Sequence, residues 1–211
     1  MSRVLIVDDH ELLRRGIRDL LVSRLGSDLF IGEAGTAKDA IRLLSEENWD
    51  LAVLDINMPD GSGLEVLEEI GRLRLSTRAL ILTSYPEEQF AVRAFKMGAS
   101  GYLTKQSVSD ELVKAIKRIL AGGKYVTVSL AERLASSLGA GDDSPPHETL
   151  SHRELQVFRS IATGRSTKEV ADELALSEKT VATYRTRIVE KTGLKTSVEI
   201  ARYALKHGLV D

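Results

Sequence analysis

Residues 51–63 read LAVLDINMPDGSG and contain the clearest signal for the fold. Its first part, LAVLD, is a short apolar run that ends in an aspartate, and such a run predicts a buried β-strand. Turn-forming residues follow, and LEVLEEIGRL (64–73) then has the spacing of an amphipathic helix. A buried strand followed by a helix is the repeating unit of a parallel α/β sheet.

The same pattern repeats on both sides of this stretch. We expect strands at residues 4–7, 29–34, 51–55, 79–83 and 101–104. We expect helices at 11–25, after Thr36 through Leu44, and at 64–73, 87–98 and 110–123. Five such units in about 120 residues predict an α/β fold, a doubly wound (βα)5 parallel sheet covered by helices on both faces.

The rest of the chain predicts a linker and a small all-α domain. Residues 126–138 have helical character, and GAGDDSPPHE (139–148) has the composition of a flexible linker. Four helices follow, three of them after capping-box signatures, at 152–163, 167–174, 178–192 and 197–207. The second and third are close enough for a helix-turn-helix. The expected boundaries are 1–123 for the first domain, 124–148 for the linker helix and linker, and 149–211 for the second domain.

The amino-acid composition excludes several classes of protein. The chain has no cysteine, which excludes a disulfide scaffold, a thiolate metal site and a cysteine nucleophile. No apolar run is long enough to span a bilayer and no signal peptide is visible, so we expect a cytoplasmic protein without a membrane partner. The four histidines show no metal-ligand spacing, and no site is assigned to them.

Charge differs in sign between the two halves. Residues 151–211 contain 11 Lys and Arg against 8 Asp and Glu, whereas residues 1–150 contain 18 against 23. A basic second half suits an anionic partner such as DNA, although an excess of this size also arises by chance.

Polar residues gather where the expected strands end. Asp8 and Asp9 follow the first strand, Asp55 ends the third, Thr83 ends the fourth and Lys105 follows the fifth. Carboxyl ends of parallel strands share one edge of the sheet, so these side chains should converge. Clustered carboxylates repel each other unless a cation is present, and oxygen ligands suit Mg²⁺. With the metal bound, one carboxylate is a nucleophile for phosphorus, as in other aspartyl-phosphate chemistry.

The motifs VLIVDDH (4–10), LAVLDINMPDGSG (51–63), LILTS (80–84) and GYLTK (101–105) resemble the signature of the response-regulator receiver domain, which has a flavodoxin-like fold. The resemblance covers about residues 2–123. It implies that Asp55 is the phosphoacceptor and that Lys105 pairs with the phosphoryl group. It further implies that Thr83 supplies a hydroxyl to the phosphoryl group and that Tyr102 is an aromatic switch. The implied Mg²⁺ ligands are Asp8, Asp9, Asp55 and the backbone carbonyl of Asn57.

Residues 149–210 resemble a LuxR-type helix-turn-helix domain, so the whole chain is similar to the NarL/FixJ class of response regulators. In a helix-turn-helix the second helix enters the major groove of DNA. Here that helix begins after Ser177, and we expect Val181 and Ile188 to face the core. The family often has histidine at the position of Tyr184.

Candidate DNA contacts follow from this placement. Lys168, Lys179 and Thr180 are candidates for phosphate contacts, and Thr183, Thr186 and Arg187 for base contacts. The full set of candidate DNA-binding residues is Lys168, Ser177, Lys179, Thr180, Thr183, Tyr184, Thr186, Arg187 and Lys191.

The resemblance implies a transcription regulator that is not an enzyme with a separate substrate, although it catalyses its own phosphorylation and dephosphorylation. A histidine kinase donates the phosphoryl group, a homodimer forms and binds promoter DNA, and RNA polymerase is a further possible partner. Two alternatives remain open at this point. A phosphatase with an aspartyl nucleophile would use the same edge, but Asn57 stands where such enzymes have a second aspartate. A DNA-binding regulator whose receiver is never phosphorylated is the other.

Overall fold

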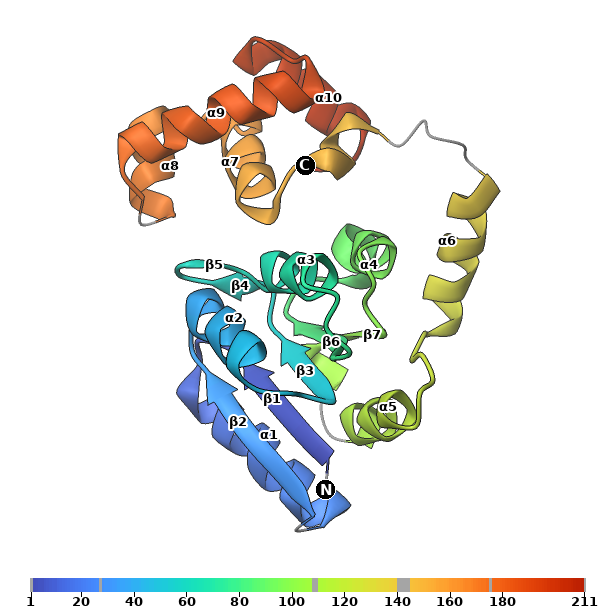
Figure 1. The fold of residues 1–211 in the computed structure, drawn as a ribbon. Coiled ribbons are helices and arrows are strands. Elements are labelled where there is room, and N and C mark those ends of the chain that lie inside the picture. The colour runs from blue at the N-terminus through green and yellow to red at the C-terminus, as the bar shows by residue number, and fades with distance from the viewer. Residues whose placement is uncertain (1, 27, 108–109, 140–144, 175, 211) are drawn as a thin grey trace. The chain divides into compact units, whose positions relative to one another are not determined.

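A computed structural model describes residues 2–26, 28–107, 110–139, 145–174 and 176–210 of the chain. The chain forms two compact units, Met1–Gly141 and Asp142–Asp211. Figure 1 colours the first unit from blue to yellow and the second in orange and red. Among the described helices, none is long and apolar enough to cross a membrane.

The first unit is built on a five-stranded parallel sheet with the strand order β2-β1-β3-β6-β7 (Figure 1). The strands are β1 (Ser2–Val7), β2 (Leu29–Ala34), β3 (Leu51–Leu54), β6 (Arg78–Thr83) and β7 (Gly101–Thr104). The direction of winding reverses at β1, which pairs with β2 on one side and β3 on the other. This is the flavodoxin-like order, in which ligands bind beyond the carboxyl ends of the strands near the reversal. The predicted fold class is confirmed.

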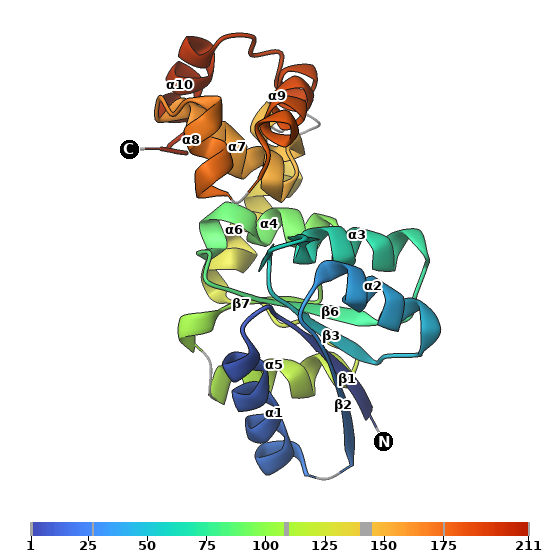
Figure 2. The same ribbon diagram turned by 90° about the vertical axis from the view of Figure 1, so that its left-hand side faces the viewer.

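Helices cover both faces of this sheet. Figure 2 shows α1 and α5 on one face and α2, α3 and α4 on the other. Their bounds are α1 (Glu11–Leu25), α2 (Ala37–Glu46), α3 (Gly63–Arg72), α4 (Glu87–Lys96) and α5 (Asp110–Leu120).

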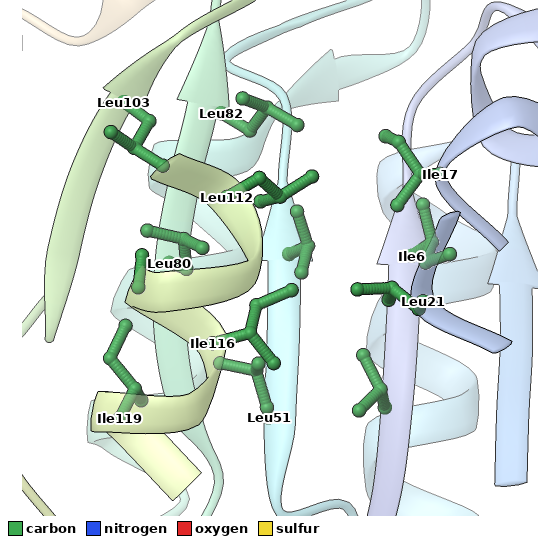
Figure 3. Packing of buried hydrophobic residues seen from close by; sticks show 13 residues of the cluster. Ile6, Ile17, Leu21, Leu51, Leu80, Leu82, Leu103, Leu112, Ile116 and Ile119 are labelled. Carbon is green, nitrogen blue, oxygen red and sulfur yellow. The ribbon is translucent and has the colours of Figure 1, made fainter. Parts of the chain in front are cut away.

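The core beneath α1 and α5 covers one face of the apolar runs in the central strands (Figure 3). Leu21 of α1 and Ile116 of α5 are fully buried against side chains of β1, β3 and β6. Val4 and Ile6 of β1 belong to this cluster, and Leu5, on the opposite face of the strand, is equally buried. A strand covered on both faces has no polar side, so its sequence lacks alternation.

Local signals place the helix ends close to where the sequence predicted them. The hydroxyl of Thr36 accepts a hydrogen bond from the amide of Asp39 and caps α2 as expected. A side-chain oxygen at this position satisfies a backbone N–H that has no partner inside the helix. The short antiparallel hairpin of β4 (Asn57–Met58) and β5 (Gly61–Ser62) was not predicted. Strands of two residues are too short to show a periodic pattern.

Helix α6 (Val128–Gly139) belongs to the first unit and packs against α4. The carboxylate of Glu87, the first residue of α4, accepts hydrogen bonds from the hydroxyls of Thr127 (2.8 Å) and Ser129 (3.1 Å). Arg133 forms a further ion pair with Glu88 (3.1 Å). The sequence predicted this helix but not its partner. Of the predicted linker 139–148, residues 140–144 lie outside the described residues.

The second unit consists of four helices that follow a short 3-10 helix, η2 (Pro146–Thr149). They are α7 (His152–Ala162), α8 (Thr167–Glu173), α9 (Glu178–Thr192) and α10 (Ser197–Lys206). Capping boxes begin α7, α8 and α10, as the sequence predicted. The buried side chains include Phe158, Val170, Val181, Ile188 and Ile200. Val181 and Ile188 therefore face the core as expected.

Glu154 joins the capping box of α7 to α9. Glu154 is 2% exposed, and its carboxylate accepts hydrogen bonds from the Ser151 amide (2.6 Å) and from Nζ of Lys191 (2.7 Å). Burial alone would raise the pKa of Glu154, but the hydrogen bonds from Lys191 and Ser151 hold that pKa below its ordinary value. A carboxylate with a lowered pKa stabilises the fold above its unfolded-state pKa.

We expect Glu154→Gln to lower the free energy of unfolding of the second unit at pH 7 by about 2 kcal/mol, because two charge-assisted hydrogen bonds are weakened. Since the pKa is lowered, this contribution is complete above about pH 4.5 and disappears as the pH falls through the folded-state value. Denaturation followed by circular dichroism measures the loss, and Trp49 fluorescence identifies unfolding of the first unit. Glu169→Gln, in the exposed capping box of α8, is the control and should have a smaller effect. Equal losses in the two variants would contradict the prediction.

Candidate functional site

The predicted polar residues meet at the carboxyl edge of the sheet. Asp8 and Asp9 follow β1, Asp55 follows β3, Thr83 ends β6, and Lys105 begins the 3-10 helix η1 (Lys105–Ser107) after β7. A hollow of about 250 Å³ opens at this edge, and its lining residues are His10, Asp55, Asn57, Thr83, Ser84, Tyr85 and Lys105.

Two buried carboxylates share one ammonium group at the base of this hollow. Asp8 is 2% exposed and Asp55 is 3% exposed. Nζ of Lys105 lies 2.6 Å from Oδ2 of Asp8 and 2.6 Å from Oδ2 of Asp55. The other oxygen of Asp55, Oδ1, accepts a hydrogen bond from the Asn57 amide (3.3 Å). The ammonium group thus separates two like charges that would otherwise repel each other in a medium of low dielectric constant.

This environment changes the acidity of both partners. Burial raises the pKa of Asp55 and the charge of Asp8 adds to that effect, whereas Lys105 opposes it; the net shift is upward. Burial by itself would lower the pKa of Lys105, but hydrogen bonds to Asp55 and Asp8 outweigh it and raise that pKa. Lys105 therefore stays charged at neutral pH, whereas burial destabilises the ionised form of Asp55.

The donor set fits a divalent cation. Ligand atoms of Asp8, Asp9, His10 and Asp55 all lie within 4.8 Å of one another. Three carboxylates balanced by one lysine leave a net negative charge, and carboxylate oxygens are the ligands that Mg²⁺ prefers. The acidic pocket is therefore compatible with Mg²⁺.

Two residues of this pocket were missed in the sequence. Nδ1 of His10 lies 2.9 Å from Asp8 Oδ1 and 2.7 Å from Asp9 Oδ1, although no site was assigned to it. Its position directly after two aspartates was the available signal. Nη1 of Arg14 donates a hydrogen bond to the backbone carbonyl of Asp8 (2.6 Å). A side-chain contact to a backbone carbonyl leaves no mark in the residue pattern.

Thr83 lines the pocket, whereas Tyr102 is not among its lining residues. Both residues are fully buried. The Tyr85 amide donates to the hydroxyl of Thr83 at 3.5 Å, and the hydroxyl of Tyr102 donates to the carbonyl of Tyr85 (3.0 Å), just before α4. Burial, together with the nearby carboxylate of Glu87, raises the pKa of Tyr102 far above the physiological range, so this hydroxyl remains a donor.

The backbone after Asp55 is fixed by close packing. A Cβ added to Gly63, the first residue of α3, would lie 2.2 Å from the carbonyl oxygen of Asp55. Glycine is therefore required at this position, because the absent side chain lets the start of α3 touch the Asp55 backbone.

A second candidate site lies on α9. The side chain of Ser177 caps this helix by accepting a hydrogen bond from the Thr180 amide (3.0 Å). A shallow hollow of about 330 Å³ is lined by Lys179, Thr180, Thr183, Tyr184 and Arg187. Lys168 and Thr186 are also exposed, on α8 and α9. Most of the predicted DNA contacts thus gather on one side of the second unit.

Lys191 differs from the other candidates, because its ammonium group pairs with Glu154 (2.7 Å). The geometry gives this lysine a role in joining α9 to α7. Glu154 is 37 residues away in the chain, so the sequence pattern did not reveal the pair.

Comparison with known proteins agrees with both units. The response regulator receiver domain family matches residues 4–117, and the luxR family of bacterial regulatory proteins matches residues 148–204. The response regulator GacA of Pseudomonas aeruginosa is 36% identical over 212 residues, which cover 100% of this chain and 99% of GacA. The response regulator UvrY of Escherichia coli K12 is 35% identical, with 100% and 97% covered.

A solved structure has a similar fold. RcsB from Salmonella enterica serovar Typhimurium, bound to promoter P1flhDC in the presence of the phosphomimetic BeF3−, is similar with a TM-score of 0.60. It is 26% identical, and the similarity covers 96% of this chain and 97% of that one. Taken with the fold and the acidic edge, these matches define a transcription regulator of a two-component system, with a receiver domain followed by a DNA-binding domain. The chain belongs to the NarL/FixJ (LuxR) class of response regulators.

In the absence of divalent cations, we expect Asp55→Asn to raise the free energy of unfolding of the first unit at pH 7. The raised pKa of Asp55 means that its stabilising contribution is complete below the unfolded-state value of 3.8 and is lost as the pH rises through the folded-state value. Asparagine does not ionise, so the variant does not lose stability as the pH rises through that value. Denaturation in EDTA at pH 4 and pH 7, followed by Trp49 fluorescence, measures the difference. Asp9→Asn changes a more exposed carboxylate and serves as the control. A destabilised Asp55→Asn protein at pH 7 would contradict the expectation.

Proposed function

We propose that Asp55 accepts a phosphoryl group from a histidine kinase and that this modification controls binding of promoter DNA by the second unit. The observation that carries the proposal is the buried Asp55 carboxylate, held against Lys105 and Asp8 at the carboxyl edge of the sheet. A LuxR-type DNA-binding domain follows it in the same chain. A cytoplasmic location suits a protein with such a domain.

The chemistry is phosphoryl transfer to a carboxylate. An oxygen of Asp55 forms the new bond to phosphorus while the N–P bond of the donor phosphohistidine breaks, and the imidazole leaves with the electron pair. Asp8, Asp9, Asp55 and the carbonyl of Asn57 would hold Mg²⁺, which supplies positive charge to the phosphoryl oxygens. Lys105 moves from its carboxylate partners to a phosphoryl oxygen, and the Thr83 hydroxyl donates to another. Attack of water on the same phosphorus returns Asp55 and inorganic phosphate, so the domain catalyses its own dephosphorylation.

The signal leaves the pocket through a connected set of contacts. A Thr83 hydroxyl drawn toward the phosphoryl group loosens its contact with the Tyr85 amide. Tyr102 holds the Tyr85 carbonyl from the other side, at the entrance to α4. Glu87 then links the first turn of α4 to Thr127 and Ser129 at the start of α6. Helix α6 precedes the second unit in the chain, so its attachment to α4 suits a control point between the proposed domains 1–123 and 149–211.

DNA binding is assigned to the exposed face of α8 and α9. Lys168, Lys179 and Thr180 would contact phosphates, and Thr183, Thr186 and Arg187 would reach base edges, with Ser177 and Tyr184 beside them. Lys191 takes part only if it leaves Glu154. A homodimer formed on phosphorylation would present two such faces to two half-sites about one helical turn apart. RNA polymerase is a further proposed partner at the promoter.

The test measures the affinity of the full-length protein for its promoter DNA with and without Mg²⁺ and beryllofluoride, a phosphoryl mimic. The mimic should tighten binding by wild type and have no effect on Asp55→Asn. Arg187→Ala should weaken binding about 10- to 100-fold in both conditions, because a guanidinium contact to a base edge is lost.

Controls separate the two halves of the proposal. Circular dichroism and Trp49 fluorescence establish that both variants are folded. A wild-type DNA affinity that stays the same when the mimic is added would contradict control by Asp55. Unchanged DNA binding by Arg187→Ala would contradict only the assignment of the DNA face.

We expect Glu87→Ala to reduce the mimic-dependent gain in DNA affinity toward one, because the half-buried carboxylate that holds α6 to α4 is removed. Binding of the mimic itself should not change. The matched control is Glu88→Ala, which removes the next acidic residue in the same helical turn. Its pair with Arg133 is exposed and therefore weak, so the gain should persist in that variant. A full gain in Glu87→Ala would show that the α4–α6 contact does not carry the signal.

A further inference from the structure

The turn of the β4–β5 hairpin is tied to a distant helix by one carboxylate. Oδ1 of Asp60 accepts a hydrogen bond from the Ala37 amide (2.9 Å), and Oδ2 accepts one from the Lys38 amide (3.1 Å). These are the first two amides of α2, and neither has a partner within the helix. A carboxylate at this place also interacts favourably with the helix dipole.

Helix α2 already has a cap from its own strand–helix connection. Thr36 precedes the helix and its hydroxyl accepts from the third amide, that of Asp39 (3.1 Å). Asp60 is 23 residues from Ala37 in the chain, so its two hydrogen bonds join separate elements. The additional cap therefore does more than begin a helix, because it also fixes the position of the hairpin turn.

Close packing supports the same attachment. A Cβ added to Gly61, next to Asp60, would lie 2.9 Å from the Cβ of Ala37. The hairpin turn thus rests directly on the first residue of α2.

The hairpin carries a residue of the acidic pocket. Asn57 pairs with Ser62 and Met58 pairs with Gly61, so a movement at the turn is passed to Asn57 through two pairs. The end of the hairpin near the pocket is anchored by buried Met58 and by the contact of Gly63 with the Asp55 carbonyl. Asp60 anchors the opposite end, at the turn.

We infer that Asp60 is a positioning residue for the Mg²⁺ site, because it clamps the hairpin on α2 and so holds the backbone carbonyl of Asn57 in place. The inference rests on the proposed function, in which that carbonyl is a metal ligand. Mg²⁺ demands near-ideal octahedral geometry, so a small displacement of one ligand weakens binding. Groups that orient metal ligands from outside typically change metal affinity by about 10- to 100-fold.

Thr36→Ala and Asp60→Ala form a matched pair for the test. Each removes a cap from the N-terminus of α2, but Asp60→Ala also releases the hairpin. The readout is Mg²⁺ binding to the full-length protein, followed by NMR shifts of the Asp9 and Asn57 amides during titration with MgCl2. We expect Asp60→Ala to raise the Mg²⁺ Kd about tenfold, and Thr36→Ala to leave it within about twofold of wild type. Asp60→Asn keeps one acceptor and should fall between wild type and Asp60→Ala.

Denaturation followed by Trp49 fluorescence verifies that the variants are folded and gives the stability lost in each. An unchanged Kd in Asp60→Ala would overturn the inference and leave the proposed function intact. Equal weakening by Thr36→Ala and Asp60→Ala would also overturn it, because general loosening of α2 would then explain the effect. Wild-type protein that shows no Mg²⁺-dependent shifts at the pocket would instead contradict the proposed function.

Discussion

The ammonium group of Lys105, placed between the buried carboxylates of Asp8 and Asp55, is the interaction around which the first unit is organised. It lies 2.6 Å from each of them. Two ionised carboxylates at such a depth repel each other, and each alone would favour its protonated form. Strands β1, β3 and β7 all end at the same edge of the parallel sheet. The sheet therefore brings together both the carboxylates that repel each other and the ammonium group that separates them. A group that adds positive charge, or that modifies Asp55, necessarily changes this balance.

Several contacts connect this pocket to the neighbouring elements. Gly63 brings the start of α3 against the Asp55 carbonyl, and the β4–β5 hairpin is held at its turn by Asp60. On the other side, Tyr102 joins the end of the pocket to the entrance of α4, and Glu87 joins α4 to α6. These contacts are hydrogen bonds and close packing between rigid elements, which shift as units rather than deform.

The second unit is stabilised in part at the ends of its helices. Helices α7, α8 and α10 are short, so their ends account for a large share of the backbone groups that need partners, and capping boxes supply partners at their N-termini. Glu154 belongs to one of these boxes and also pairs with Lys191, which fastens α9 to α7. The polar residues that line the hollow on α9 stay accessible while Val181 and Ile188 anchor the helix from beneath.

The order and type of the major elements follow from the pattern of residues alone. The apolar run LAVLD and the periodic helix at 11–25 depend on residue spacing, and the three capping boxes depend on residues three positions apart, so these signals are local. Convergence of Asp8, Asp55 and Lys105 also followed, because the carboxyl ends of parallel strands share an edge. Four contacts became visible only in three dimensions. His10 joins the carboxylates, Lys191 pairs with Glu154, α6 packs on α4, and Asp60 caps α2. Each of these contacts depends on side-chain direction, and all but that of His10 join residues far apart in the chain. The spacing of residues along the chain encodes which face of an element is buried, but not which distant group a polar side chain will meet.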